Sequence, residues 1–246
     1  MLQNLFRNIS PVVKNLLIIN VLFFIAQFML PGLMDKLALY PISSEEFKPW
    51  QLATHFFMHS TAGLMHIFFN MFALVMFGSQ LERVWGPKKF LIYYFAAAFG
   101  AAALHLLIGY FRFQNLADTF SAEELEYFYT FTNQYSEDGK TFGLAFPEKF
   151  RTLQAMLHTP VLGASGAVFG LLAAYGYLFP NTELYLMFIP VPIKAKYFVM
   201  GYAAIELYSG IANSPGDNVA HFAHLGGALV GIIMVLIWQR QKNQFF

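Results

Sequence analysis

The sequence contains no cysteine among its 246 residues. That absence excludes disulfide bonds, zinc sites built on thiolates and cysteine nucleophiles, and it leaves the redox compartment undetermined. Charged residues are also scarce, at 12% of the chain, against about 25% in a soluble domain. The deficit indicates that much of the surface faces lipid. The net charge of +1 gives a nucleic acid no electrostatic reason to bind.

Apolar residues take the place of charge and make up 57% of the chain. A membrane-spanning helix needs about 20 of them in sequence. Six segments qualify: 12–30, 62–81, 90–111, 161–180, 195–212 and 219–238. The first run ends at Pro31-Gly32 without the small-x-small cleavage site of a signal peptide, so we expect it to be a retained span. The pattern predicts an all-α membrane protein, a polytopic bundle of six transmembrane helices that forms one domain over residues 1–246.

The distribution of Lys and Arg predicts the orientation of this bundle. With the N-terminus in the cytoplasm, nine of the 15 basic residues fall on the cytoplasmic side. Of the six that fall outside, four lie within residues 112–160, and long loops carry less weight in this rule. We therefore expect both termini in the cytoplasm and residues 112–160 outside.

Residues 112–160 form the only sizeable polar region of the sequence. Ser121 followed by Glu124 matches a capping box, which predicts a short helix over 121–129. Two interpretations of the whole segment stay open. It is either an external loop that shields the top of the bundle or a contact for a partner or substrate.

Four polar residues inside the expected spans are candidates for chemistry, because polar groups are costly in a bilayer and usually functional there. They are His66, Asn70, Ser165 and His224. At about 1.5 Å per residue, His66, Ser165 and His224 each lie roughly 6–8 Å below the outer end of their span. Asn70 follows His66 by one helical turn on the same face. We therefore expect the four side chains in one layer near the outer leaflet.

Two pairs of glycines indicate how two of these residues meet. Gly166 and Gly170 follow Ser165 in the fourth span, and Gly227 and Gly231 lie on the face of His224 in the sixth. Small residues spaced four apart let helix backbones approach closely in membranes. Docking the two glycine faces brings the histidine toward the serine.

A serine beside a neutral imidazole has the makings of an activated nucleophile, because the imidazole takes the hydroxyl proton. His66, Asn70 and the backbone amide of Ser165 are then placed to donate hydrogen bonds to a developing oxyanion. This combination predicts acyl transfer with Ser165 as nucleophile and His224 as base.

The motifs that carry these residues resemble the rhomboid family of intramembrane serine proteases, of the bacterial type. The resemblance runs from about residue 50 to 238. It rests on His66-Ile-Phe-Phe-Asn70, on Gly163-Ala-Ser-Gly166, on Ala223-His224-Leu-Gly-Gly227 with Gly231, and on Leu81-Glu82-Arg83 followed by Gly86. It implies a catalytic Ser165–His224 dyad and an oxyanion hole at His66 and Asn70, with Gly163 beside them.

The same resemblance implies an intramembrane serine endopeptidase that acts on other membrane proteins. We expect substrates with helix-destabilising Gly, Pro or Ser in the outer part of a single span and a small residue before the cut. No cofactor is implied. The expected location is a bacterial inner membrane.

Several further residues are expected to support the Ser165–His224 pair or to lie beside it. Phe169 stands where well-studied members often have tyrosine, and it is expected to stack on His224 without the hydroxyl. His59 is placed at the outer mouth, where it would assist His66, and His221 shares the face of His224. Glu206, inside the fifth span, is expected to bond a neighbour that the sequence does not identify. No third catalytic member is visible, so the sequence predicts a dyad.

Three other classes of protein are alternatives to the serine protease. A metal or haem site would draw on His59, His66, His221 and His224, and metal analysis tests it. A catalytically inactive relative would bind membrane clients without cutting them, and labelling by a fluorophosphonate tests that. A transporter would show paired intramembrane charges or a half-helix repeat, and neither is visible.

Overall fold

The computed structural model describes residues 9–137, 147–185, 191–212 and 219–243. Its regular structure is almost entirely helical. The helical elements are α2 (Pro11–Met29), α3 (Leu33–Leu37), α4 (Gln51–Thr54), the 3₁₀ turn η1 (His55–Phe57), α5 (Met65–Ala73), the π-helical turn η2 (Leu74–Gly78), α6 (Ser79–Trp85), α7 (Pro87–Ala117), α8 (Ala122–Glu137), α9 (Glu148–His158), α10 (Ser165–Leu178), α11 (Ala195–Ala212) and α12 (His221–Asn243). Two short strands, β1 (Glu183–Leu184) and β2 (Ile193–Lys194), pair antiparallel.

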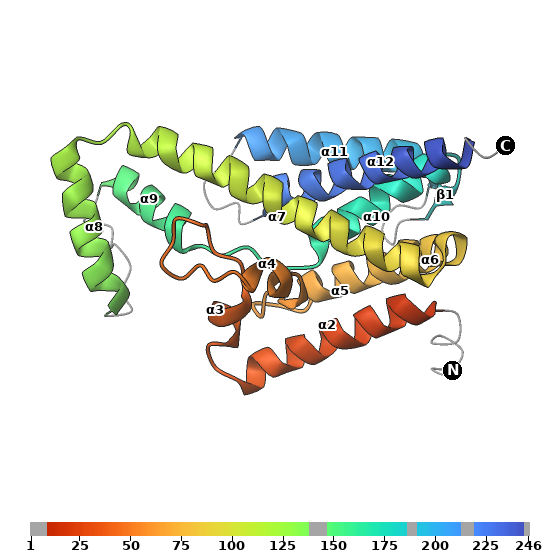
Figure 1. Ribbon diagram of the computed structural model, residues 1–246, viewed down its shortest axis with the longest axis horizontal. Coiled ribbons are helices and arrows are strands. Elements are labelled where there is room, and N and C mark those ends of the chain that lie inside the picture. The colour runs from red at the N-terminus through yellow and green to blue at the C-terminus, as the bar shows by residue number, and fades with distance from the viewer. Residues whose placement is uncertain (1–8, 138–146, 186–190, 213–218, 244–246) are drawn as a thin grey trace.

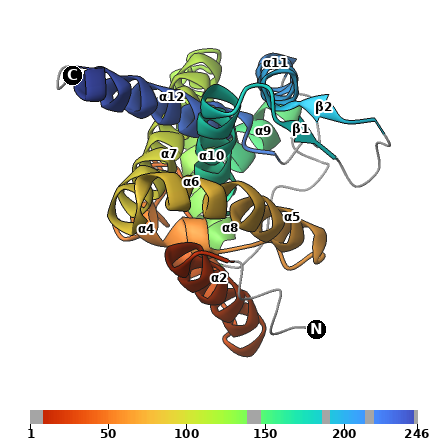
Figure 2. The same ribbon diagram turned by 90° about the vertical axis from the view of Figure 1, so that its right-hand side faces the viewer.

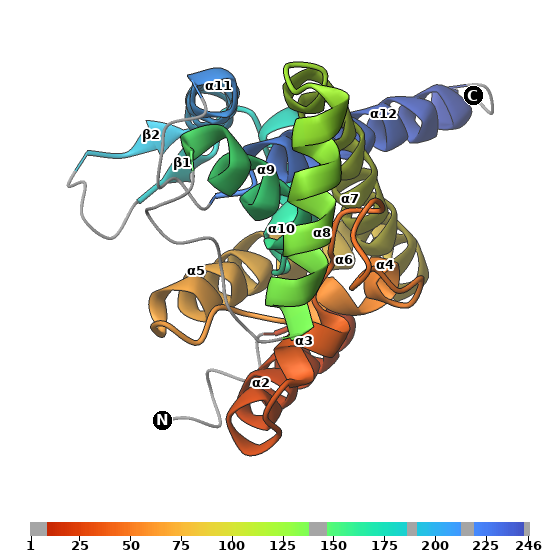
Figure 3. The same cartoon turned by 90° about the vertical axis from the view of Figure 1, so that its left-hand side faces the viewer.

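Helix α10 lies in the centre of the bundle, with α5, α6, α7, α11 and α12 around it (Figure 2). Every residue from Gly166 to Gly176 is buried, which explains why this helix has no polar face. Helices α8 and α9 lie at one end of the molecule, while α6, the start of α2 and the end of α12 lie at the other (Figure 1). Viewed from the first end, α8 crosses in front of the bundle (Figure 3).

Three of the described helices are long and apolar enough to cross a membrane: Pro11–Met29, Pro87–Ala117 and His221–Gln241. They correspond to the first, third and sixth spans expected from the sequence. Together with the helical content, they confirm an all-α polytopic membrane protein. The second expected span is the continuous run of α5, η2 and α6, and the fifth has the same bounds as α11.

The fourth expected span, 161–180, is shorter in the structure. Helix α10 has 14 residues, which rise about 21 Å, whereas the hydrocarbon layer is about 30 Å thick. The residues before it are extended, and Val161 forms an antiparallel bridge with Leu39. The helix therefore begins at Ser165, after an extended segment, and ends at Leu178, inside the bounds expected for the span.

The described part of residues 112–160 is mostly helical and contains more helix than the single short segment 121–129 expected from the sequence. Helix α7 continues to Ala117, and α8 and α9 follow. The capping box is present at the start of α8, where the Ser121 N–H donates to Glu124 Oε2 (2.8 Å) and the Glu124 N–H donates to Ser121 Oγ (3.2 Å). The three helices bury a small second core of Phe113, Ala117, Phe120, Phe128, Phe150, Leu153 and Leu157. Its members are too scattered along the chain for sequence periodicity to reveal them.

The start of α2 is fixed by the buried carboxylate of Glu82 in α6. The Glu82 oxygens accept hydrogen bonds from the backbone N–H groups of Val12 and Val13, at 3.0 Å each, and from the Ser10 hydroxyl. These N–H groups have no partner within the helix, and a negative charge there complements the helix dipole. The contact joins the first helix to the rest of the bundle.

Candidate active site

Ser165 is the first residue of α10. The turn before it is held by the Gly163 N–H, which donates to the His55 carbonyl at 3.0 Å. Gly163 has a φ of 117°, a conformation that favours glycine, and a Cβ there would lie 2.9 Å from Cε1 of His66. This turn delivers Ser165 to a helix N-terminus, where backbone N–H groups point toward an incoming anion.

Helices α10 and α12 meet backbone to backbone through the two glycine pairs. A Cβ on Gly227 would lie 1.9 Å from the Gly166 carbonyl oxygen, and a Cβ on Gly231 would lie 3.1 Å from the Gly170 Cα. A side chain does not fit at the first of these positions without separating the helices. The close approach brings the first turn of α12 beside the first turn of α10.

His224, in that first turn of α12, lies between Ser165 and a carboxylate. Its Nε2 is 2.9 Å from Ser165 Oγ, and its Nδ1 is 2.9 Å from Glu206 Oε2. An ionised carboxylate only accepts hydrogen bonds, so Nδ1 carries the hydrogen and Nε2 presents its lone pair to the serine. The ring also stacks on Phe169, with centroids 4.2 Å apart and planes at 6°. This order of donors and acceptors is the one that a general base requires.

His66 has the opposite arrangement of hydrogens. The Ser60 N–H donates to His66 Nδ1 at 3.1 Å, so in the neutral ring the hydrogen is on Nε2. A Cβ on Gly163 would lie 3.0 Å from that Nε2 and 3.6 Å from Ser165 Oγ. The imidazole thus directs an N–H toward the region of the serine. One N–H of the Asn70 amide donates to the His66 carbonyl at 2.8 Å, which leaves the second for another acceptor.

Two other histidines flank this group. The His59 backbone makes reciprocal hydrogen bonds with the Gln27 side chain, at 2.8 and 3.0 Å, and its ring centroid is 5.3 Å from that of His66. His221 Nδ1 is 2.6 Å from Glu206 Oε2. Within the described ranges, no three His, Cys, Asp or Glu side chains are arranged to hold a metal ion.

Glu206 is the site residue whose partner the sequence did not identify. It is buried in α11, and the sequence prediction of a dyad assumed that no acidic group reached His224. The available signal was a lone carboxylate in an apolar span, which normally requires a partner. Spacing along the chain does not show which face of α12 meets α11, so the partner became visible only in the structure.

The candidate site lies in a cleft of about 1880 Å³. Its wall includes all four sequence-predicted polar residues, together with aromatic side chains of α5 and α11: Phe69, Phe72, Phe198 and Tyr202. Pockets for small ligands measure about 300–1,000 Å³. The cleft is therefore large enough for a segment of polypeptide.

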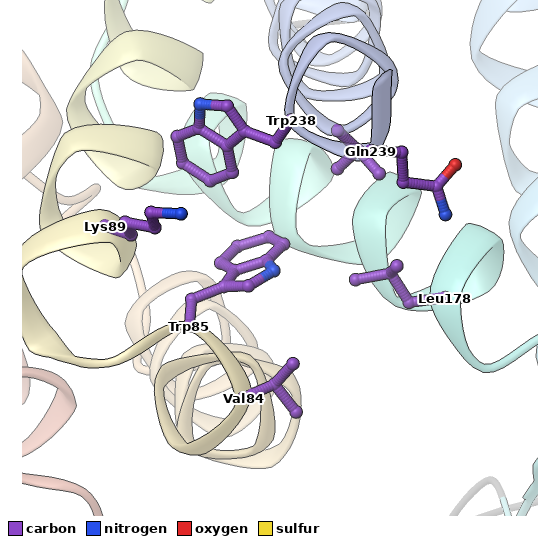
Figure 4. A pocket seen from close by; sticks show the side chains of 7 residues that line it. Val84, Trp85, Lys89, Leu178, Trp238 and Gln239 are labelled. Carbon is purple, nitrogen blue, oxygen red and sulfur yellow. The ribbon is translucent and has the colours of Figure 1, made fainter. Parts of the chain in front are cut away.

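A smaller pocket of about 360 Å³ lies at the opposite end of the bundle (Figure 4). The rings of Trp85 and Trp238 are 5.4 Å apart, and Lys89 Nζ lies 5.6 Å from the Trp238 ring. Tryptophan and lysine are typical of the membrane–water interface. The described lining holds no Ser, Cys or His, and we assign no chemistry to it.

Comparison with known proteins identifies the family. The Rhomboid domain profile matches residues 46–119 and 125–241. RHOMBOID-like protein 12, mitochondrial, of Arabidopsis thaliana is 30% identical over 225 residues, which cover 89% of this chain and 53% of that protein. Rhomboid protein 1, mitochondrial, of Saccharomyces cerevisiae is 34% identical over 101 residues, 39% of this chain and 26% of that protein.

A third relative, Rhomboid-like protein 16, chloroplastic, of Arabidopsis thaliana, is 25% identical over 198 residues, 79% of this chain and 50% of that protein. The chain thus spans about half the length, or less, of these curated relatives. The profile covers most of the chain, including the segments that hold all three polar motifs. The chain belongs to the rhomboid family.

Proposed function

We propose that this chain is an intramembrane serine endopeptidase that cleaves peptide bonds in or near the transmembrane segments of other membrane proteins. Membership of the rhomboid family supports an intramembrane protease at the level of class. The finer proposal rests on one observation, the 2.9 Å contact between Ser165 Oγ and His224 Nε2 inside a large cleft.

In the proposed reaction, Ser165 Oγ bonds to the scissile carbonyl carbon while its proton passes to His224 Nε2. The π electron pair of the carbonyl moves to its oxygen, which accepts hydrogen bonds from the Ser165 amide, His66 Nε2–H and the Asn70 amide. When the intermediate collapses, the amine leaves with the proton from His224. Water then repeats the sequence on the acyl-enzyme and releases the second product.

The proposed substrates are membrane proteins with a helix that unwinds near the outer leaflet. A transmembrane helix pairs all of its own backbone groups, so its carbonyls are not accessible to Ser165 until it opens. Glycine costs about 1 kcal/mol and proline about 3 kcal/mol in a helix interior relative to alanine. Substrates with Gly, Pro or Ser in the outer part of the span should be cut fastest. A small residue before the cut suits a site crowded by Phe169 and by closely packed helices.

A matched pair of substrates tests this preference. Outer-span glycines of a model single-span substrate are replaced by leucine, and the cleavage rate is compared with the parent. We expect slower cleavage of the leucine version. Equal rates would show that the enzyme does not select for helix opening.

We further propose that both termini face the cytoplasm and that the chain resides in a bacterial inner membrane. The excess of Lys and Arg on the side of the termini supports the orientation. The resemblance to bacterial-type members suggests the compartment, whereas the printed names of the relatives refer to mitochondria and chloroplasts for those proteins. Fractionation of the source cell into its membranes tests the compartment.

Purified protein, Ser165→Ala and His224→Ala are incubated with a panel of single-span substrates and, separately, with a fluorophosphonate. We expect cleavage and labelling by the wild type and neither by the variants, with all three folded. Folded wild-type protein that neither cleaves nor takes the label would indicate a client-binding, inactive relative instead.

A further inference from the structure

The buried carboxylate of Glu206 makes two contacts with α12. Its Oε2 lies 2.9 Å from His224 Nδ1 and 2.6 Å from His221 Nδ1, and the residue is 3% exposed. A carboxylate removed from water is destabilising unless hydrogen bonds replace its hydration. Here the donors that replace it come from two imidazole rings, one of which also contacts Ser165.

We propose that Glu206 is a positioning residue for His224, so that the active site works as a Ser165–His224–Glu206 triad. The proposal rests on the serine protease function proposed above. As Oγ bonds to the substrate carbonyl, the serine proton moves to Nε2 and the imidazole becomes a cation. Glu206 stays ionised throughout, keeps the hydrogen on Nδ1 and stabilises the cation by charge and hydrogen bond.

Phe169 and Glu206 control different degrees of freedom of the same ring. The parallel stack with Phe169 fixes the plane of the imidazole. A stack of that kind is nearly unchanged by a 180° rotation of the ring about the Cβ–Cγ bond, which exchanges Nδ1 with Cδ2 and Nε2 with Cε1. The hydrogen bond to Glu206 distinguishes the two orientations, and only the observed one directs Nε2 to Ser165.

A purely structural explanation for Glu206 would be that it fastens α11 to α12. That task is already performed one helical turn further along. A Cβ on Gly210 would lie 3.2 Å from His221 Cβ and 3.1 Å from the Phe222 ring, so the helices are in close contact there without Glu206. The Arg112 side chain donates to the Gly210 carbonyl and lies over the Phe222 ring at 4.9 Å, which ties α7 to the same point.

The test compares Glu206→Gln and Glu206→Asp in the full-length protein in detergent, with a single-span substrate. The control is Glu82→Gln, which neutralises the buried carboxylate of α6 that contacts the start of α2 and lies outside the cleft. For each protein, kcat, KM, the fluorophosphonate labelling rate and the melting temperature are measured.

We expect Glu206→Gln to lower kcat and the labelling rate by at most about 10⁴-fold, the loss seen when the carboxylate of a serine–histidine–aspartate triad becomes an amide, with KM within about twofold of wild type. Phe169 still holds the ring plane, which limits the loss. Glu206→Asp should recover part of the rate because it restores the charge. Glu82→Gln should lower the melting temperature and leave kcat unchanged. A folded Glu206→Gln protein with wild-type kcat and labelling rate would overturn the proposal.

The hydrogen position on His224 gives a readout that does not depend on activity. In wild-type protein with ¹⁵N-labelled histidine, the His224 signals, identified by their loss in His224→Ala, should show a protonated Nδ1 and an unprotonated Nε2. If wild-type protein cleaves no faster than Ser165→Ala, the protease proposal fails, and this spectrum still tests Glu206. A protonated Nε2 in wild-type His224 would overturn the triad whether or not the protein is an enzyme.

Discussion

At the scale of single residues, two imidazole rings in the same cleft are held in opposite states by their neighbours. The Ser60 N–H occupies Nδ1 of His66, so His66 offers an N–H from its other nitrogen. The Glu206 carboxylate occupies Nδ1 of His224, so His224 offers a lone pair to Ser165. In the proposed mechanism, one residue type thereby supplies an oxyanion donor and a base, and the difference lies in the group that each Nδ1 contacts.

Asn70→Ala should be the mildest of the changes to the polar residues. Removing a principal oxyanion donor costs about 2.7–4 kcal/mol. One N–H of Asn70 is already used by the His66 carbonyl, and the Ser165 amide and His66 remain as donors. We expect kcat to fall roughly tenfold, below that full cost, with KM little changed. Steady-state kinetics on one substrate measures both values, and a wild-type kcat would remove Asn70 from the mechanism.

At the scale of elements, the short length of α10 and its glycine contacts with α12 create the site together. Helix α10 begins at Ser165 because the residues before it pair with Leu39 and His55 and do not continue the helix. Helix α12 comes close enough for His224 because Gly227 has no side chain. The proposed reaction should therefore be sensitive to packing along the whole α10–α12 contact.

Gly227→Val tests that sensitivity. Its side chain would begin 1.9 Å from the Gly166 carbonyl oxygen, so α12 must move away from α10. Overpacking costs about 1–3 kcal/mol, and contact with rigid backbone places this case at the upper end. We expect a lower melting temperature and loss of cleavage. Gly201→Val in α11 is the matched control, since a Cβ there meets nothing within 4 Å and should change neither property.

A second contact between elements predicts a pH dependence. Glu46, in the segment before α4, accepts a hydrogen bond from the Ser44 hydroxyl, and its Oε1 lies 2.8 Å from Nδ1 of His158 in α9. Burial alone would raise the pKa of the Glu46 carboxyl, but the hydrogen bonds with Ser44 and His158 outweigh it and hold the pKa below the ordinary value of 4.5. A lowered pKa means that the ionised carboxylate stabilises the fold above pH 4.5 and that this contribution disappears as the pH falls through the folded pKa.

Glu46→Gln isolates this contribution. Melting temperatures of wild type and variant should differ near neutral pH and converge only as the pH falls through the folded pKa, which lies below 4.5, because the wild-type carboxyl is then neutral as well. Glu45→Gln, at the exposed neighbouring position, is the control: the difference between its melting temperature and that of wild type should not depend on pH in this way. A constant difference between wild type and Glu46→Gln down to pH 3 would contradict the role of the charge.

At the scale of the whole molecule, the two ends of the bundle have different contents. One end holds α8 and α9, and α9 lines the cleft; the other end holds α6, the start of α2 and the end of α12 (Figure 1). Trp85 in α6 and Trp238 in α12 pair there, beside Lys89. The N-terminal end of α2 and the C-terminal end of α12 therefore lie on the same side of the bundle. This arrangement agrees with an even number of membrane crossings.

Single cysteines test the orientation without interference, since the native chain has none. Glu123→Cys in α8 and Gln241→Cys at the end of α12 are both exposed positions. An impermeant maleimide added to intact cells should label the first, and the second only after the membrane is opened. Labelling of both in intact cells would refute the proposed orientation and the depth assigned to Ser165.

The sequence by itself determined the membrane class, the approximate spans and the order of the polar motifs. These are local properties, because transfer from water to lipid acts on each apolar segment separately and glycine spacing marks a face of one helix. Only the tertiary structure decided that α10 starts at Ser165, that α7, α8 and α9 enclose a second core, and that Glu206 reaches His224. The last contact joins residues 18 apart on different helices, and the Ser165–His224 contact joins residues 59 apart. Such pairings depend on the rotation and depth at which whole helices dock, which the pattern of any single helix does not contain.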